Sequence, residues 1–165
     1  MTVEPLTDYS RLCVHTITTK GWEIEEAIDC YKEAGVSGIT VWRQWLEGHN
    51  PDKVGDRIRS AGLKIVSLCR GGFYPAIKEA ARAEAIDDNR LAIEQAAALG
   101  APLVVLVCGA DPGQSLVESR KQIIDGIAAI HFVDGIGRKH YPFNKTVATI
   151  LVEDELECRK LEPTS

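Results

Sequence analysis

The strongest constraint on the fold is a pattern that occurs three times, in which a helix-like segment closes on glycine and a strand-like run soon follows. The three closing pairs are Ala34-Gly35, Ala61-Gly62 and Leu99-Gly100. Glycine readily takes the left-handed conformation that ends a helix. Each apolar run then leads through a polar or glycine-containing loop into another helical pattern. With a first strand-like run at residues 11–16, the chain has four successive strand-helix units, and such units form parallel sheets.

This pattern predicts the individual elements. The apolar runs predict four strands, at residues 11–16, 39–42, 63–68 and 102–108. The first helix has an apolar stripe with spacings of three and four, formed by Ile24, Ala27, Ile28, Tyr31 and Ala34. Asn50-Pro51 has the form of a helix start, and Ser115 to Glu118 has the form of a capping box. The last helix is expected to bury Leu116, Ile123, Ile124, Ile127 and Ile130.

Four such units fit either a doubly wound sheet or one half of an eight-stranded barrel. No G-x-G-x-x-G motif follows the first strand, which disfavours a dinucleotide-binding fold. A length of 165 residues allows one domain with a sizeable core. The pattern alone does not decide between the two architectures.

The composition is that of an ordinary soluble protein and disfavours several classes of partner. The net charge is −5 and no Lys/Arg cluster occurs, so we expect no nucleic-acid partner. No apolar run reaches the ~18 residues that a membrane helix needs. Residues 1–11 lack the basic and apolar segments of a signal peptide. The five cysteines form no C-x-x-C pair, which favours reduced, buried thiols in a cytoplasmic protein over disulfides or a zinc site.

The most informative stretch for function is residues 68–75 (LCRGGFYP), at the end of the third predicted strand. Parallel α/β proteins bind ligands outside the carboxyl ends of their strands. Arg70 has the forked geometry that grips an anionic or hydroxyl-rich ligand. The two glycines let the backbone turn sharply or approach a ligand closely, and Phe73 and Tyr74 could wall a pocket. The alternative is a strand-to-helix loop with a solvated arginine.

Three further candidates lie at the ends of neighbouring strands. Arg43 stands at the position that corresponds to Arg70, so both arginines could face one ligand. His15 closes the first strand, where it could hydrogen-bond a hydroxyl, and Trp42 could stack on a sugar. Each also has a structural interpretation, as a satisfied histidine, a packed tryptophan or a solvated arginine.

Asp87, Asp88 and Asn89 form a polar run that invites a metal-site interpretation. Consecutive residues of a helix point in different directions, however. We therefore expect these side chains to face solvent or to anchor a neighbouring loop.

Several of these segments together resemble the sugar phosphate isomerase/epimerase family, whose domain is the xylose isomerase-like TIM barrel. The resemblance runs from about Arg11 to Ile130 and is carried by Val41-Trp42-Arg43, residues 68–75, Asp87-Asp88-Asn89-Arg90, residues 94–101 and residues 105–109. It implies a (β/α) barrel that binds a sugar-like polyol or its phosphate at the carboxyl ends of the strands. It also implies a divalent metal held by carboxylates and histidine, with acid/base carboxylates that move a proton next to a carbonyl.

The resemblance covers only half of the family's domain. A full barrel has eight strands and typically ~250 residues, whereas the likeness ends after four units. The family's metal-binding glutamate, at the end of the fifth strand, has no match here. The resemblance therefore predicts an α/β fold of TIM-barrel type, truncated to a half barrel at residues 1–130, with a divergent tail at residues 131–165. It leaves the catalytic residues unknown, predicts no metal bound by this chain, and implies substrate-binding roles for His15, Trp42, Arg43, Arg70 and Phe73.

The tail changes character at His131. Residues 131–145 are typical of a loop, residues 146–152 of a strand, and residues 153–162 of a weak, charged helix. One interpretation is unrelated sequence from a frameshift, a mis-spliced exon or an incomplete gene model. The other is a strand beside the fourth, with Glu153 near the place of the metal-binding glutamate. One carboxylate does not hold a divalent cation without partners.

Two functions stay open at this point. The first is an isomerase or epimerase of a small sugar, sugar phosphate or related hydroxy-carbonyl compound, in which this polypeptide alone is inactive because it lacks a recognisable base and metal set. The second is a non-catalytic half barrel that acts through a homodimer or a partner chain, since a four-stranded sheet leaves two edges and one face uncovered. A reading frame without a stable product is a third possibility.

Overall fold

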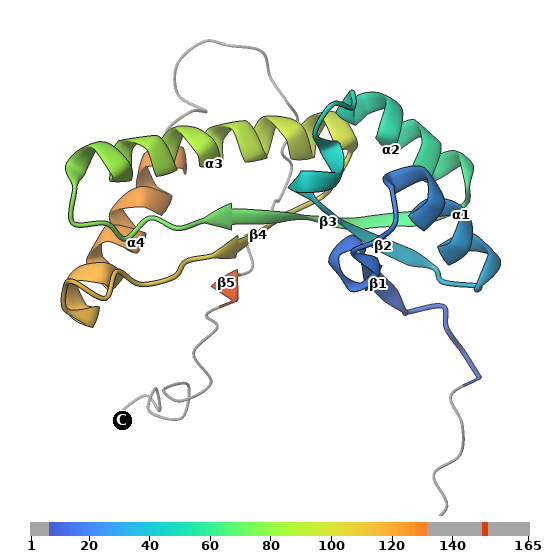
Figure 1. The fold of residues 1–165 in the computed structure, drawn as a ribbon, viewed down its shortest axis with the longest axis horizontal. Helices are drawn as coiled ribbons and strands as arrows, with labels where there is room; N and C mark the ends of the chain where they lie inside the picture. The colour runs from blue at the N-terminus through green and yellow to red at the C-terminus, as the bar shows by residue number, and fades with distance from the viewer. Residues whose placement is uncertain (1–6, 132–149, 152–165) are drawn as a thin grey trace, which may run out of the picture.

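The computed structural model describes residues 7–131 and 150–151, and its centre is a parallel sheet (Figure 1). The strands are β1 (Cys13–His15), β2 (Gly38–Trp42), β3 (Lys64–Gly72), β4 (Val104–Val107) and β5 (Ile150–Leu151). Their order in the sheet is their order in the chain, and every neighbouring pair is parallel. A doubly wound sheet reverses its strand order at a switch point. The observed order is instead that of a barrel wall, so the predicted partial TIM-barrel fold is confirmed.

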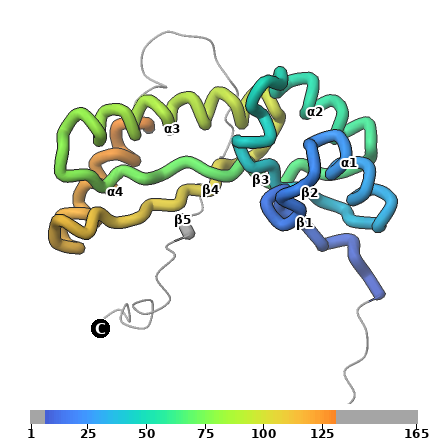
Figure 2. The backbone as a smooth tube through the Cα atoms, viewed as in Figure 1, coloured from blue at the N-terminus to red at the C-terminus, as the bar shows by residue number. Residues whose placement is uncertain are grey.

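The helices connect these strands and cover one side of the sheet (Figure 1). They are α1 (Ile24–Glu33), α2 (Pro51–Ser60), α3 (Glu79–Leu99) and α4 (Leu116–His131), with short 3-10 helices η1 (Thr16–Thr19) and η2 (Arg43–Leu46). Asn50 caps α2, since its side-chain oxygen accepts from the Lys53 N–H at 3.1 Å. The longest helix, α3, runs alongside β3 (Figure 2) and ends at Gly100, whose φ of 81° is left-handed as predicted.

The hydrophobic core lies between the sheet and its helices. Alternate side chains of the strands enter it, among them Ile39, Val41, Leu68 and Leu106. The predicted stripe of α1 packs there as well, through Ile24, Ala27, Ile28 and Tyr31. Ala34, the last member of the predicted stripe, is exposed because it already forms the C-cap of the helix.

Helix α4 departs from the predicted burial. Ile123, Ile127 and Ile130 pack against the core, but Leu116 is 40% exposed and Ile124 is 68% exposed. Consecutive residues are about 100° apart around a helix, so Ile123 and Ile124 cannot share one narrow face. The expectation that Leu116 and Ile124 are buried was therefore wrong, and α4 keeps apolar side chains on its outer surface.

The opposite face of the sheet carries a polar layer. Thr40 of β2 is in register with Ser67 of β3, and both are buried. Their hydroxyl oxygens lie 2.8 Å apart, and the Cys13 thiol lies 3.4 Å from the Thr40 hydroxyl. Buried hydroxyl groups need such partners, so the layer joins the first three strands through satisfied polar contacts.

Two predictions from composition can be compared with the described part of the chain. Within residues 7–131 and 150–151, no helix is long and apolar enough to cross a membrane. Cys69 and Cys108 are buried thiols as expected, whereas Cys13 and Cys30 are only partly buried. Cys158 lies outside the described residues.

The tail is described only at His131, which ends α4, and at β5. Ile150 pairs with Leu106, and Leu151 pairs with Val107, both in parallel with β4. This position agrees with the predicted strand beside the fourth. The rest of that prediction, including Glu153, lies outside the described residues.

The close packing of α2 on α3 generates a first prediction. A Cβ atom on Gly55 would overlap the carbonyl oxygen of Leu99. Although alanine is the better helix former, Gly55→Ala should lower the free energy of unfolding by about 1–3 kcal/mol, because the two helices would have to separate. Urea denaturation measures this. Gly21→Ala is the control, since a Cβ there meets no atom within 4 Å, and equal losses in both variants would contradict the prediction.

Candidate functional site

Arg70 lies at the carboxyl end of β3, where the strand has a bulge. The pairing with β4 passes from Cys69 directly to Gly71, so Arg70 has no partner in the ladder. A bulge turns a side chain out of the regular alternation of a strand. The guanidinium carbon of Arg70 lies 4.2 Å from the centre of the Phe73 ring and 6.0 Å from that of the Trp42 ring. Both are cation–π distances, so Arg70 connects aromatic side chains from the ends of two strands.

Phe73 has a backbone conformation that is disfavoured for an aromatic residue. Its φ of 57° is left-handed. The Phe73 N–H donates to the Val107 carbonyl at 2.9 Å, and a Cβ on Gly109 would lie 3.6 Å from the ring. The side chain is nevertheless 46% exposed. Contacts with the end of β4 therefore hold the ring beside Arg70 while one part of it faces solvent.

Asn89 of α3 fixes the chain just before Phe73. Its side chain is buried, its Oδ1 accepts from the Gly72 N–H at 2.6 Å, and its Nδ2 donates to the Gly72 carbonyl at 2.8 Å. Nδ2 also donates to the Ala85 carbonyl at 2.7 Å. A Cβ on Gly71 would overlap the Asn89 oxygen. Gly71 and Gly72 therefore allow α3 to approach the strand closely. The sequence had suggested that these glycines allow a sharp turn or the close approach of a ligand.

His15 and Trp42 are connected by a hydrogen bond at the ends of β1 and β2. The Trp42 Nε1–H donates to Nδ1 of His15 at 3.2 Å. An indole N–H only donates, so Nδ1 is the acceptor and the proton of a neutral imidazole lies on Nε2. Burial lowers the pKa of His15, which favours this neutral form. His15 is therefore oriented by Trp42 and presents Nε2–H as a donor.

Arg43 makes a network of hydrogen bonds with α3. Its two terminal nitrogens donate to the two Asp88 oxygens at 2.8 Å each, and its Nε donates to Gln95 Oε1 at 2.7 Å. It also reaches the Arg70 carbonyl at 3.4 Å. The bonds from Arg43 hold the pKa of Asp88 below its ordinary value, although burial acts in the opposite direction. The Arg43 guanidinium thus already binds a carboxylate.

The structure brings four of the five predicted binding residues into one series of contacts. His15 contacts Trp42, Trp42 contacts Arg70, and Arg70 contacts Phe73. We call these four residues the rim site. Arg43 lies next to it but is directed to α3, where it supports the backbone of Arg70. The binding of substrate by any of these residues stays a prediction.

The polar run on α3 supplies supports that the sequence identified only in part. Asp87 pairs with Arg90, Asp88 with Arg43, and Asn89 with Gly72. The three side chains point to three different partners, as expected for consecutive helical residues. Asn89 anchors a neighbouring loop, as predicted. The contact of Gln95 with Arg43 had no signal in the sequence.

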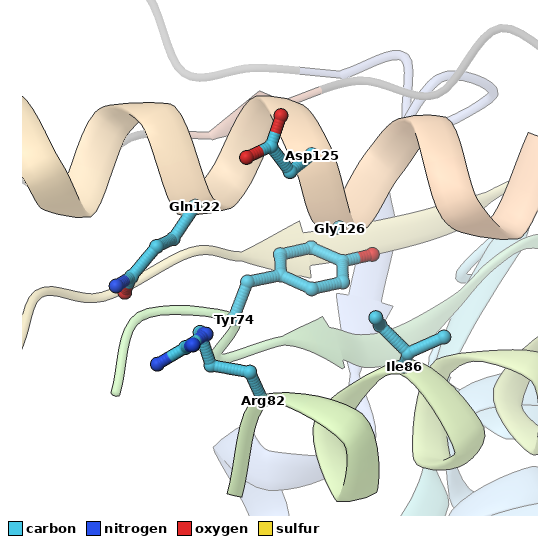
Figure 3. A pocket seen from close by; sticks show the side chains of 6 residues that line it. All are labelled: Tyr74, Arg82, Ile86, Gln122, Asp125 and Gly126. Carbon is cyan, nitrogen blue, oxygen red and sulfur yellow. The ribbon is translucent and has the colours of Figure 1, made fainter. Parts of the chain in front are cut away.

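Tyr74 does not join Phe73 in the wall of the rim site. It is 1% exposed and lies between α3 and α4, where it lines a cavity of about 100 Å³ with Arg82, Ile86, Gln122, Asp125 and Gly126 (Figure 3). Its hydroxyl has no hydrogen-bond partner among the described residues, and burial raises its pKa. The chain turns at Phe73, whose φ is left-handed, and the alternation of the strand does not continue through this turn. The expectation that Tyr74 and Phe73 wall the same pocket was therefore wrong.

The described donors do not fit a divalent metal. In residues 7–131, no three side chains of the types His, Cys, Asp or Glu come together in a group that could hold one. His15 already uses Nδ1, and the carboxylate of Asp88 binds Arg43. A divalent cation needs several oxygen or nitrogen ligands. We therefore assign no chemical step to a metal in this part of the chain.

A parallel sheet with strands in chain order, and with polar and aromatic side chains at their carboxyl ends, defines a (β/α)-barrel protein. The sequence comparison identifies the family. The profile of the xylose isomerase-like TIM barrel matches residues 28–134, and the chain belongs to this family. Among curated proteins, none has a sequence that matches this chain.

Several solved structures share the fold. Protein SMc04130 from Sinorhizobium meliloti 1021 is 36% identical with a TM-score of 0.66, over 72% of this chain and 44% of that one. The IolI protein, solved with a bound zinc atom, is 18% identical with a TM-score of 0.64, over 75% of this chain and 47% of that one. D-psicose 3-epimerase from Clostridium cellulolyticum H10, solved with D-tagatose, is 8% identical with a TM-score of 0.57, over 72% and 46%. The last two show the fold alone, and the chain spans less than half the length of all three.

The Asn89 anchor generates a second prediction. Asn89→Leu keeps a similar shape but leaves the N–H and C=O of Gly72 buried without partners. The free energy of unfolding should fall by at least about 2 kcal/mol, because each unsatisfied buried group costs about 1–3 kcal/mol. Urea denaturation measures this loss. The control is Asp87→Ala, two positions earlier on the same helix, which removes an exposed ion pair worth about 0–1 kcal/mol. Equal losses would show that the anchor does not stabilise the strand end.

Proposed function

We propose that the rim site binds a small sugar-like hydroxy-carbonyl compound, as part of a barrel of the isomerase or epimerase type. The observation that carries this proposal is the unbroken series of contacts from His15 through Trp42 and Arg70 to Phe73. Aromatic walls with a few well-placed polar groups are typical of small-molecule sites. The membership in the xylose isomerase-like family supports the same class of ligand.

Each residue has a distinct role in this proposal. The Arg70 N–H groups and the His15 Nε2–H donate to oxygens of the ligand, while the Trp42 and Phe73 rings cover its C–H faces. Arg43 acts indirectly, since its bond to the Arg70 carbonyl and its ion pair with Asp88 hold the rim backbone against α3.

The described residues are suited to binding a substrate, but they do not provide the groups that its chemical conversion needs. Proton transfer next to a carbonyl needs a positioned base and an electrophile. Asp88 is the carboxylate beside Arg70, but its lowered pKa and its ion pair with Arg43 make it a weak base. The base and the electrophile therefore have to come from outside residues 7–131, and we propose that this polypeptide alone does not turn over substrate.

The cysteines are consistent with a cytoplasmic location, which we also propose. Among the described cysteines, Cys13, Cys30 and Cys108 take part in no disulfide, and Cys108 is buried. Free thiols are typical of a reducing compartment.

A third prediction tests binding and turnover together. Incubated with Mg²⁺, Mn²⁺ or Zn²⁺ and a panel of ketoses and ketose phosphates, the chain should show no turnover at enzyme-like rates but should bind at least one compound by calorimetry. Trp42→Phe removes the donor to His15 and should weaken that binding by about three- to tenfold. Trp45→Phe is the matched control, because its indole donates to the Trp22 carbonyl instead. Enzyme-like turnover would overturn the inactivity, and absence of binding would overturn the site.

A second candidate function is self-association without catalysis. The strand β1 lies at the edge of the sheet, and α4 exposes Val117 at 75% and Ile124 at 68%. These two residues are seven positions apart and thus share one face of the helix. Exposed strand edges and apolar surfaces are common contact sites between chains, and a second copy could cover them.

A fourth prediction separates this candidate from the first. If the chain acts by pairing through α4, light scattering should give the mass of a dimer, and Ile124→Lys should return the mass of a monomer. Glu118→Lys serves as the control and should leave the dimer intact, because it introduces the same charged side chain at an exposed position of α4 that lies about 100° around the helix from Val117. A monomer with a cooperative thermal transition would exclude self-association as the function.

A further inference from the structure

We infer that the rim site selects ligands that carry an anionic oxygen group, a carboxylate or a phosphate, which Arg70 binds with His15 beside it. This inference rests on the proposed function and deepens it, because it divides the hydroxy-carbonyl compounds into charged and neutral ones. Three features support it: the hydrogen-bond donors of Arg70 and His15, the balance of charges near Arg70, and the surroundings of the Arg70 guanidinium.

The polar side-chain groups that Arg70 and His15 offer to a ligand are donors. The guanidinium of Arg70 has five N–H donors and no acceptor. Neutral His15 has one donor left, at Nε2, because Nδ1 accepts from Trp42. A hydroxyl group both donates and accepts, so a neutral polyol would find no acceptor on these two side chains. A carboxylate or a phosphate dianion only accepts, and it matches a set of donors.

The charges near Arg70 leave a positive excess. Arg43 and Arg70 contribute two positive charges, and Asp88 contributes one negative charge, so one positive charge remains. Both oxygens of Asp88 accept from Arg43. Within the described residues, no carboxylate comes within ion-pair distance of Arg70, whereas Arg43, Arg59 and Arg90 each have one and Arg57 has two. This excess contrasts with the net charge of −5 for the whole chain.

No described residue accepts a hydrogen bond from the Arg70 guanidinium, so its N–H donors are available. The guanidinium carbon of Arg70 lies over the Phe73 ring, 4.2 Å from its centre, and over the Trp42 ring, 6.0 Å from its centre. The two rings and the bulge limit the side-chain entropy that Arg70 would lose when a ligand binds. Arg70 is therefore prepared for bidentate recognition of an anion.

The test compares three probes on the full chain by calorimetry: D-fructose, D-fructose 6-phosphate and 2-keto-D-gluconate. At about 0.01 M ionic strength, at least one anionic probe should bind about tenfold or more tightly than D-fructose, and the advantage should shrink at about 0.15 M, where the Debye length falls to about 8 Å. The tighter of the two anionic probes tells a phosphate from a carboxylate. Arg70→Met should bring the ratio of affinities close to one.

Two further variants keep the result interpretable. Arg70→Lys retains the charge without the fork and should keep part of the advantage, while Arg90→Met removes an arginine whose partner is Asp87 and should keep all of it. Circular dichroism confirms that the variants fold. If D-fructose binds as tightly as both anionic probes, or if Arg70→Met preserves the advantage, the inference is wrong while the proposed function stands. If none of the three probes binds, the proposed function itself fails, and the inference fails with it.

Discussion

The bidentate contact between the Asn89 amide and Gly72 is the interaction on which the candidate site depends. At the end of β3, the Asn89 side chain takes the place of a neighbouring strand as the hydrogen-bond partner of the Gly72 N–H and C=O. It also joins the sheet to α3. Because both groups of Gly72 are satisfied, the chain can turn into the left-handed conformation of Phe73 directly afterwards. Asn89 therefore helps to place the ring of Phe73 and the bulged side chain of Arg70, although its own hydrogen bonds go to the backbone of Gly72 and Ala85.

The two arginines of the region have different physical roles. Arg43 is held by a bidentate carboxylate and an amide oxygen, so its hydrogen-bonding edge is occupied. Arg70 lies over two aromatic rings, and no described residue accepts a hydrogen bond from its guanidinium, so its donors are available to a ligand. Adjacent residues of one helix, Asp88 and Asn89, therefore fix the ends of β2 and β3. The support of the site lies in α3, and its binding groups lie on the strands.

The sequence was sufficient to place the candidate residues at the ends of strands. It did not show which of them lie in the rim site and which support it from α3. The position of His15, Trp42, Arg70 and Phe73 at strand ends follows from the strand-helix pattern and from a resemblance in sequence. The direction of Arg43 depends on Asp88 and Gln95, which are 45 and 52 residues away in the chain. Tyr74 was assigned to the wrong layer because the bulge and the turn at Phe73 set which side each residue faces. Periodicity cannot show such a turn.

The sequence by itself determined the elements and their kind. Glycines that end helices, apolar runs and capping residues act over a few positions, and so the parallel α/β character of the chain is encoded locally. The local pattern did not separate a barrel wall from a doubly wound sheet; the family resemblance predicted the barrel, and the strand order in the tertiary structure established it. Only the tertiary structure decided the exposed face of α4, and only it showed that Arg43 is bound by Asp88 and Gln95 whereas Arg70 lies beside the rings of Phe73 and Trp42. These features depend on contacts between residues far apart in the chain, whose geometry is fixed only when helices and sheet pack together.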